Sequence, residues 1–125
     1  MPPKNRKRKV RSYPLVMIGD TMALEGDTDR EVRVYAQIAW TVPFDITIPW
    51  RTEPGTATAA DYVDDAGVLV IPAGEKVGWA SLTVRGDNDI EGYESFRIVF
   101  ETPSPTGVLL QHDPLVRYVV IWDDD

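Results

Sequence analysis

Carboxylate side chains are the chemically distinctive residues of this 125-residue chain, because most of its 20 Asp and Glu residues fall in a few short segments. The segments hold Glu25 and Asp27; Asp61, Asp64 and Asp65; Asp87, Asp89, Glu91 and Glu94; and Asp123, Asp124 and Asp125. Like charges within a few ångströms of one another are unstable unless they protonate, move apart or bind a cation. Hard oxygen ligands in flexible turns suit Ca²⁺. Acids in turns are also ordinary solvated residues, so the spacing alone leaves both interpretations open.

Other reactive side chains are scarce. The chain has no Cys, which excludes a disulfide framework, a thiolate metal site and a cysteine nucleophile. Its single His, His112, is expected in a surface loop, so Ser-His-Asp chemistry is not predicted. Asp87 and Glu91 could in principle serve glycoside hydrolysis, but so short a chain shows no cleft-forming insertion. We predict no catalytic residues and a protein that is not an enzyme.

The basic residues are as unevenly distributed as the acids. Residues 1–11 contain no acid and six cations: Lys4, Arg6, Lys7, Arg8, Lys9 and Arg11. Residues 12–125 contain the other seven Lys and Arg residues and all 20 acids, so their net charge is −13. We predict that residues 1–13 form an extended basic arm, unstructured alone, whose six cations bind a partner. Short basic runs also match loose nuclear-localisation and nucleic-acid patterns, but they read no bases, and a nucleic-acid partner is not predicted.

The elements that would position the acids are β-strands. Apolar residues alternate with polar ones in seven segments bounded by Gly, Pro and Asp. These segments are 15–24, 31–41, 44–50, 67–71, 77–85, 94–101 and 115–122. No segment carries a helical stripe, so residues 14–125 are predicted to be one all-β domain, an antiparallel β-sandwich of about seven strands. Alternate turns of a sandwich lie at the same end, so the acidic turns could converge.

Two residue types refine this prediction. Pro49 lies inside a strand pattern and cannot donate to a ladder, so its nitrogen should face solvent, a bulge or an edge. The tryptophans could form a sugar-binding platform, but we expect most of them to pack in the core or between sheets. They are Trp40, Trp50, Trp79 and Trp122.

No membrane insertion or standard export is expected from this sequence. No apolar run approaches the roughly 20 residues that span a bilayer. The first residues pass from charge into strand-like sequence without the apolar core of a signal peptide.

Four motifs in register resemble the Calx-beta family. The first is WRTEPGTATAADY at residues 50–62, and GVLVIPAGE at 67–75 resembles the family's G-x-L-x-F-x-x-G-E segment. GDNDIEGYESF at 86–96 resembles its D-x-x-x-E-x-x-E-x-F turn, and VVIWDDD at 119–125 resembles its V-x-I-x-D-D-D end. The resemblance covers about residues 15–125 and implies an immunoglobulin-like sandwich.

The resemblance also implies a calcium site at one end of the sandwich, holding one or two ions. Carried over by position, the implied ligands are Glu25, Asp61, Asp87, Glu91, Asp123 and Asp125, with Asp124 and Glu94 as contributors and Asp89 through its main chain. Two departures bear on it: Gly86 stands where multi-ion members have an Asp, and the segment before Asp61 is shortened to Ala60.

The function that we expect is a non-catalytic structural or adhesion module, stabilised by calcium and docked on a larger protein assembly through its arm. The expected assembly is a virion surface or another extracellular-facing structure, with the domain as a bacteriophage capsid-decoration or tail-associated protein and with homo-oligomers as an option. Two alternatives stay open, a calcium-sensing regulatory module and a nucleic-acid-associated protein that acts through the arm.

Overall fold

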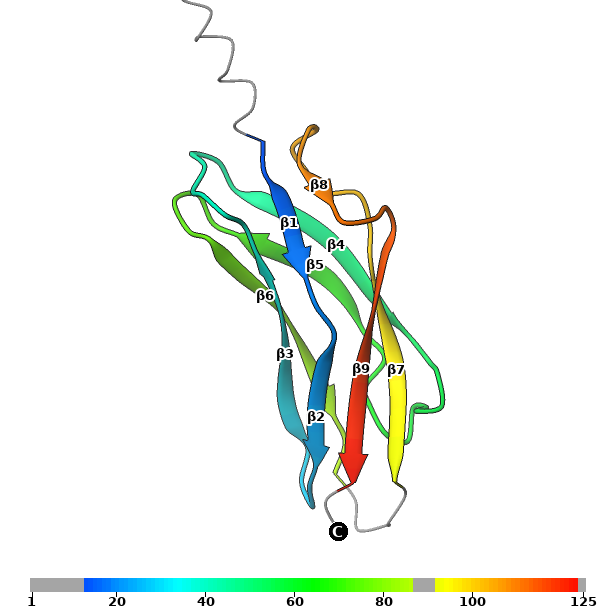
Figure 1. Ribbon diagram of the computed structural model, residues 1–125. Coiled ribbons are helices and arrows are strands. Elements are labelled where there is room, and N and C mark those ends of the chain that lie inside the picture. Colours follow the sequence, from blue (N-terminus) through cyan, green and yellow to red (C-terminus); the bar gives the residue numbers. More distant parts are fainter. Residues whose placement is uncertain (1–12, 87–91, 124–125) are drawn as a thin grey trace, which may run out of the picture.

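The described part of the computed structural model, residues 13–86 and 92–123, contains nine β-strands and no helix (Figure 1). Accordingly, these residues include no helix that could cross a membrane. The strands are β1 (Leu15–Ile18), β2 (Thr21–Glu25), β3 (Arg30–Gln37), β4 (Ile46–Glu53), β5 (Ala66–Ile71), β6 (Val77–Val84), β7 (Tyr93–Phe100), β8 (Leu109–Leu110) and β9 (Leu115–Asp123). The predicted all-β fold is confirmed.

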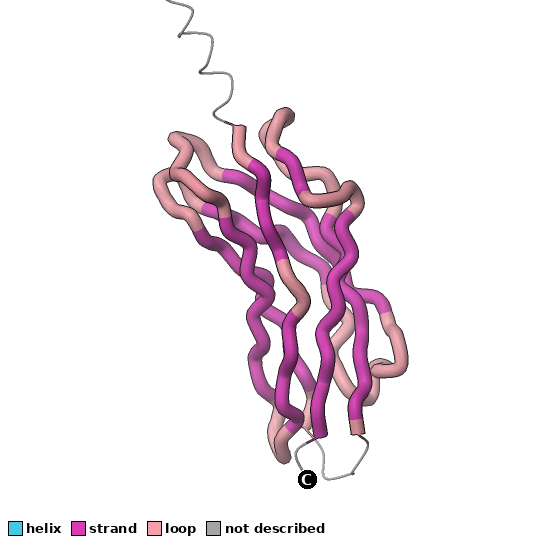
Figure 2. Tube along the Cα trace, viewed as in Figure 1, coloured by secondary structure: helices cyan, strands magenta, loops and turns pink. Residues whose placement is uncertain are grey.

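The strands form two sheets that pack as a sandwich. One sheet has the order β6-β3-β1-β8 and the other the order β2-β9-β7-β4-β5. Most neighbours are antiparallel, but β1 pairs with β8 and β2 with β9 in parallel. Figure 2 shows strands along the length of the molecule and loops gathered mainly at its two ends. Turns far apart in the sequence therefore meet at each end.

The core lies between the sheets and is built from alternate residues of each strand. Ile46, Ile48 and Trp50 of β4 are buried, as the alternation predicts. Inside the sandwich the ring of Tyr62 stacks on that of Phe96, with centroids 3.9 Å apart and planes 3° apart. Burying each large apolar side chain stabilises the fold by roughly 1.5–3 kcal/mol.

The expectation of a single strand over residues 15–24 is wrong. The structure divides this segment between β1 in one sheet and β2 in the other, with Gly19 and Asp20 as the crossing point. The Asp20 carboxylate accepts the backbone N–H of Tyr118 at 2.9 Å, so the crossing is fixed to β9. The two-residue strand β8 is too short for its periodicity to be detected, and the count rises from seven to nine strands.

Pro49 lies opposite a bulge, one of the three places that the sequence allows. Trp50 pairs with Phe100, whereas Thr47 is bridged to Ser104, so three residues of one segment oppose two of the other. Glu101 donates its backbone N–H to the Pro49 carbonyl at 2.8 Å, so Pro49 presents its polar backbone to this irregular stretch. The missing N–H of Pro49 therefore removes no hydrogen bond from the regular part of the ladder.

The expectation that most tryptophans pack inside is wrong. Trp50 is buried, but Trp40, Trp79 and Trp122 are each nearly half exposed. Trp79 and Trp122 occupy outward positions in the alternation of β6 and β9, and Trp40 lies beyond Gln37, where β3 ends. Two faces of the sandwich thus carry exposed aromatic rings.

The six cations predicted to bind a partner, Lys4, Arg6, Lys7, Arg8, Lys9 and Arg11, lie outside the described residues. Tyr13, the last residue assigned to the arm, contacts the domain: its ring centroid is 5.6 Å from that of Phe44. Next to it, the carbonyl of Pro14 accepts the N–H of Leu109 at 3.2 Å. The chain is therefore anchored from Tyr13 onward.

Candidate metal-binding pole

The acidic segments meet at one end of the sandwich, which we call the acidic pole and define as residues 25–29, 58–61, 85–86 and 123. Glu25 and Asp123 are register partners at the parallel ends of β2 and β9. Gly86 donates its N–H to the Asp29 carboxylate at 3.0 Å. Arg85 donates its N–H to the Asp61 carbonyl at 2.8 Å. These contacts bring the backbone segments together at one end, as expected because alternate turns of a sandwich lie at the same end.

Asp61 is the most informative residue of the acidic pole because it is buried, with only 4% of the residue exposed. Its Oδ2 accepts the N–H of Thr58 at 2.9 Å, and its own N–H is donated to the Thr58 carbonyl at 2.8 Å. Among the described residues, no hydrogen bond reaches the other oxygen, Oδ1, and no cation pairs with it. A buried carboxylate with spare acceptor capacity is costly unless a charge or a donor compensates it.

Gly86 explains one departure from the family pattern. A Cβ built on Gly86 would collide with the backbone of Thr28, in the turn between β2 and β3. An aspartate at position 86 would therefore need the backbone of both turns to move. The close packing that brings Asp29 to Gly86 thus leaves this position without a carboxylate.

Arg30 brings a positive charge to the same end. Its guanidinium lies against Gly26, close enough that a Cβ on Gly26 would collide with it. Arg85 brings a second positive charge, since its Nε donates to the Ala59 carbonyl at 3.0 Å. The described part of this end therefore combines acids with two cations, Arg30 and Arg85.

The other implied ligands fall into two groups. Glu94 lies on β7, partly buried and opposite Ile121, and the backbones of Glu25 and Asp123 end their strands. Asp87, Asp89, Glu91, Asp124 and Asp125 lie outside the described residues. Within 13–86 and 92–123, no three Asp, Glu or His side chains come together as a metal cluster. The ligand set stays a prediction.

Asp29 and Thr58 are two residues of the acidic pole that were not predicted from the sequence. Asp29 lies two residues after Asp27 in the same acidic turn, so its position in the sequence could have marked it as a candidate site residue. Its contact with Gly86 joins turns 57 residues apart and has no local signature. Thr58 acts through its backbone N–H, which no side-chain pattern reveals.

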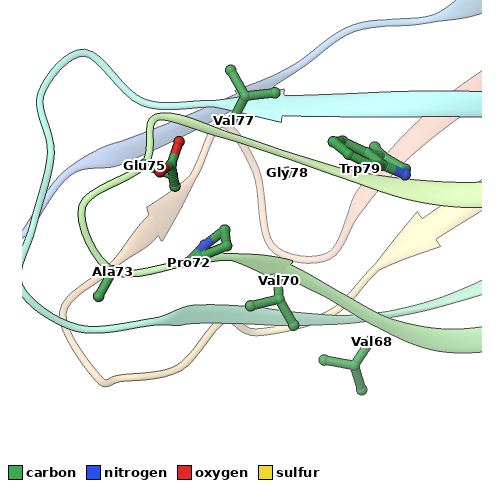
Figure 3. A pocket seen from close by; sticks show the side chains of 8 residues that line it. All are labelled: Val68, Val70, Pro72, Ala73, Glu75, Val77, Gly78 and Trp79. Carbon is green, nitrogen blue, oxygen red and sulfur yellow. The ribbon is translucent and has the colours of Figure 1, made fainter.

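A groove of about 640 Å³ opens at the other end of the sandwich, beside the β5–β6 turn (Figure 3). Its walls include Val68 and Val70 of β5 and Val77 and Trp79 of β6, and Glu75 is its one ionisable residue. Ala73 donates its N–H to Asp45 at 2.8 Å, which ties this turn to the loop before β4. This apolar groove differs chemically from the acidic pole.

Comparison with known proteins identifies the family. A family model described as the Calx-beta domain matches residues 16–125. The chain belongs to the Calx-beta family. The resemblance of the four motifs is thereby confirmed, and this Calx-beta domain occupies nearly all of the sequence.

Solved structures similar to this Calx-beta domain support the assignment. The apo form of the Calx CBD1 domain is 29% identical, with a TM-score of 0.70, over 91% of this chain and all of that one. The calcium binding domain CBD12 of CALX1.1 is 28% identical, with a TM-score of 0.72, over 88% of this chain and 46% of that one. The Calx CBD2 domain, at 16% identity and a TM-score of 0.69, shares the fold. Among curated protein sequences, none matches this chain.

Proposed function

We propose that this Calx-beta domain is a non-catalytic, calcium-binding structural module that docks on a larger assembly through its basic arm. The observation that carries the calcium part is the buried carboxylate of Asp61 at the junction of the acidic segments. Family membership and the similarity to a domain named for calcium binding support the same conclusion.

The residues that would hold calcium are those of the acidic pole and its continuation. They are Glu25, Asp61, Asp87, Glu91, Asp123 and Asp125, with Glu94, Asp124 and the main chain of Asp89 as further donors. When bound, Ca²⁺ supplies positive charge that offsets carboxylate repulsion. Because Gly86 carries no carboxylate, one or two ions is the stoichiometry that we propose.

The chain's own contacts orient these donors. The N–H of Thr58 fixes Oδ2 of Asp61 and leaves Oδ1 free to accept another partner. Pairing of β2 with β9 brings Glu25 beside Asp123, although 98 residues separate them in sequence.

The basic arm is the proposed attachment site. Its six cations, with no acid among them, are complementary to an acidic protein surface. The domain carries the opposite charge, so we expect it to contribute little to binding such a surface. We extend the proposal to a virion as the assembly, with the domain as a capsid-decoration or tail-associated component. The basis of this extension is the division of the chain into a basic arm and an acidic sandwich.

Co-sedimentation tests the attachment. The full chain and a variant that lacks residues 2–11 are mixed with particles stripped of this protein, at low and high salt. We expect the full chain to sediment at low salt, and the deletion or high salt to release it, because exposed charges are screened beyond about 8–10 Å. Equal sedimentation of both proteins would overturn docking through the arm. Retention on nucleic acid alone would support the nucleic-acid alternative instead.

A further inference from the structure

The loop between β4 and β5 carries Asp61 and connects the two sheets at the acidic pole. Val63 donates its N–H to the Thr83 carbonyl of β6 at 3.0 Å. The Asp61 carbonyl accepts the N–H of Arg85, directly after β6, at 2.8 Å. On its other side the loop contacts Ser95 of β7. The loop therefore links the four-stranded sheet, which contains β6, to the five-stranded sheet, which contains β7.

A threonine side chain makes the contact between this loop and β7. Ser95 lies beyond the end of β4, whose last pairing with β7 joins Glu53 to Arg97. The backbone N–H of Ser95 is donated to the Thr56 hydroxyl at 2.9 Å, and its carbonyl accepts the N–H of Ala57 at 2.9 Å. The Thr56 hydroxyl thus acts as the acceptor that a backbone carbonyl of β4 would be if the ladder continued.

Backbone packs directly on backbone where the loop contacts Ser95. A Cβ built on Gly55 would collide with the Ser95 carbonyl, and Ala57 is fully buried. Thr56 lies between these two residues and is exposed to solvent. Because it is exposed, its side chain contributes through the hydrogen bond to Ser95 rather than through burial.

The same loop and strand carry two of the implied calcium ligands, Asp61 and Glu94. Asp61 precedes Tyr62, whose ring stacks on that of Phe96 with centroids 3.9 Å apart. Glu94 and Phe96 are two residues apart on β7, so their side chains lie on the same face of the sheet. The place of Asp61 relative to Glu94 therefore depends on how the loop is held against β7.

We infer that Thr56 is a positioning residue of the calcium site. Its hydroxyl holds the loop on Ser95 and thereby sets the place of the Asp61 carboxylate relative to β7. The buried carboxylate of Asp61, whose Oδ1 accepts no hydrogen bond among the described residues, is the observation that ties this loop to a cation. The inference rests on the proposed function, because it assigns a role within the proposed calcium site.

Hydrogen exchange of the full chain in chelator separates positioning from a general loss of stability. Thr56→Val keeps the shape of the side chain and removes the acceptor of the Ser95 N–H. In this variant the N–H of Thr58, which the Asp61 carboxylate accepts, should exchange several times faster than in the wild type. The N–H of Ala73, which the Asp45 carboxylate accepts at the opposite end, should keep its rate. Equal acceleration at both amides, or none at Thr58, would overturn the inference.

Isothermal titration of the full chain with calcium measures the consequence for the site. Thr56→Val should raise the dissociation constant by about tenfold, as the loss of a group that orients metal ligands typically does. Thr56→Ser keeps the hydroxyl and should bind calcium as the wild type does. Thr102→Val, which removes an exposed hydroxyl bonded to Asp113 beyond the other end of β7, should also bind as the wild type does.

The outcomes of this titration distinguish the inference from the proposed function. If the wild type and Thr56→Val bind calcium with equal affinity, Thr56 has no positioning role and the calcium site stands. A Thr56→Ser protein as weak as Thr56→Val would also overturn the role of the hydroxyl. If the wild type binds no calcium, the proposed function and the inference both fall.

Discussion

Gly86 donates its backbone N–H to the carboxylate of Asp29 at 3.0 Å, and this contact joins the turn after β2 to the end of β6. It explains how acidic segments far apart in the sequence share one end of the sandwich. It also leaves no space for a side chain at position 86, because the backbone of Thr28 lies where a Cβ would be. Backbone packing thus limits the number of carboxylates that the acidic pole can hold.

Gly86→Ala should lower the free energy of unfolding by about 1–3 kcal/mol, because the new methyl group meets backbone that cannot rotate away. Gly19→Ala is the matched control, since a Cβ on Gly19 would meet nothing within 4 Å. Urea unfolding of both variants measures the difference. A Gly86→Ala protein as stable as the control would show that the two turns are not packed as described.

Asp61→Asn should remove the negative charge of this buried residue and keep an oxygen that accepts a hydrogen bond. The amide oxygen can still accept the N–H of Thr58, so without calcium the variant should be at least as stable as the wild type. Its calcium-induced rise in melting temperature should be lost. Asp45→Asn, which alters an acceptor of a backbone N–H at the opposite end, should keep that rise. A full rise in Asp61→Asn would remove Asp61 from the calcium site.

Tyr62 should make the stability fall at alkaline pH. Burial, followed by the nearby charge of Asp64, raises the pKa of the Tyr62 phenol above its usual value of 10.0. The unfolded chain then releases this proton first, so the stabilisation is full below about pH 10 and is lost as the pH rises toward the folded pKa. Tyr62→Phe keeps the stacking on Phe96 and should lose less stability between pH 9 and 11. Parallel curves for the two proteins over that range would contradict this assignment.

Deleting residues 2–11 should leave the melting temperature nearly unchanged, because these residues have no apolar periodicity. Tyr13→Ala should instead lower the free energy of unfolding by about 0.5–1.5 kcal/mol, since it removes the ring pair with Phe44. Thermal unfolding of both proteins in chelator makes the comparison. A large loss on deletion would mean that the arm is part of the folded domain.

The strands were predictable where alternation is long and one face is buried. Phe96, Ile98 and Phe100 of β7 face the core as the pattern requires. The crossing from β1 to β2 was missed, although it has a signal in the sequence. Val16 and Ile18 place the even positions inside, and Asp20 would have been the next buried residue, so its charge marks the change of sheet.

The sequence was enough to predict which turns share one end of the sandwich, but not which atoms contact one another there. Alternate turns of a sandwich share an end, which brings Glu25 to Asp123 without knowledge of any distance. The role of Thr58 and the collision at Gly86 depend on backbone positions that side-chain type does not encode. The exposure of Trp122 follows from its outward register in β9, which the general preference of tryptophan for the core concealed.

Scanning calorimetry of the full chain, in calcium and in chelator, tests the central claim that the acidic pole binds calcium. Binding to the folded state alone stabilises it by about 2.7 kcal/mol when free calcium is 100 times the dissociation constant. We therefore expect the melting temperature to rise with calcium concentration, by several degrees at saturation. Identical transitions in calcium and in chelator would contradict the account.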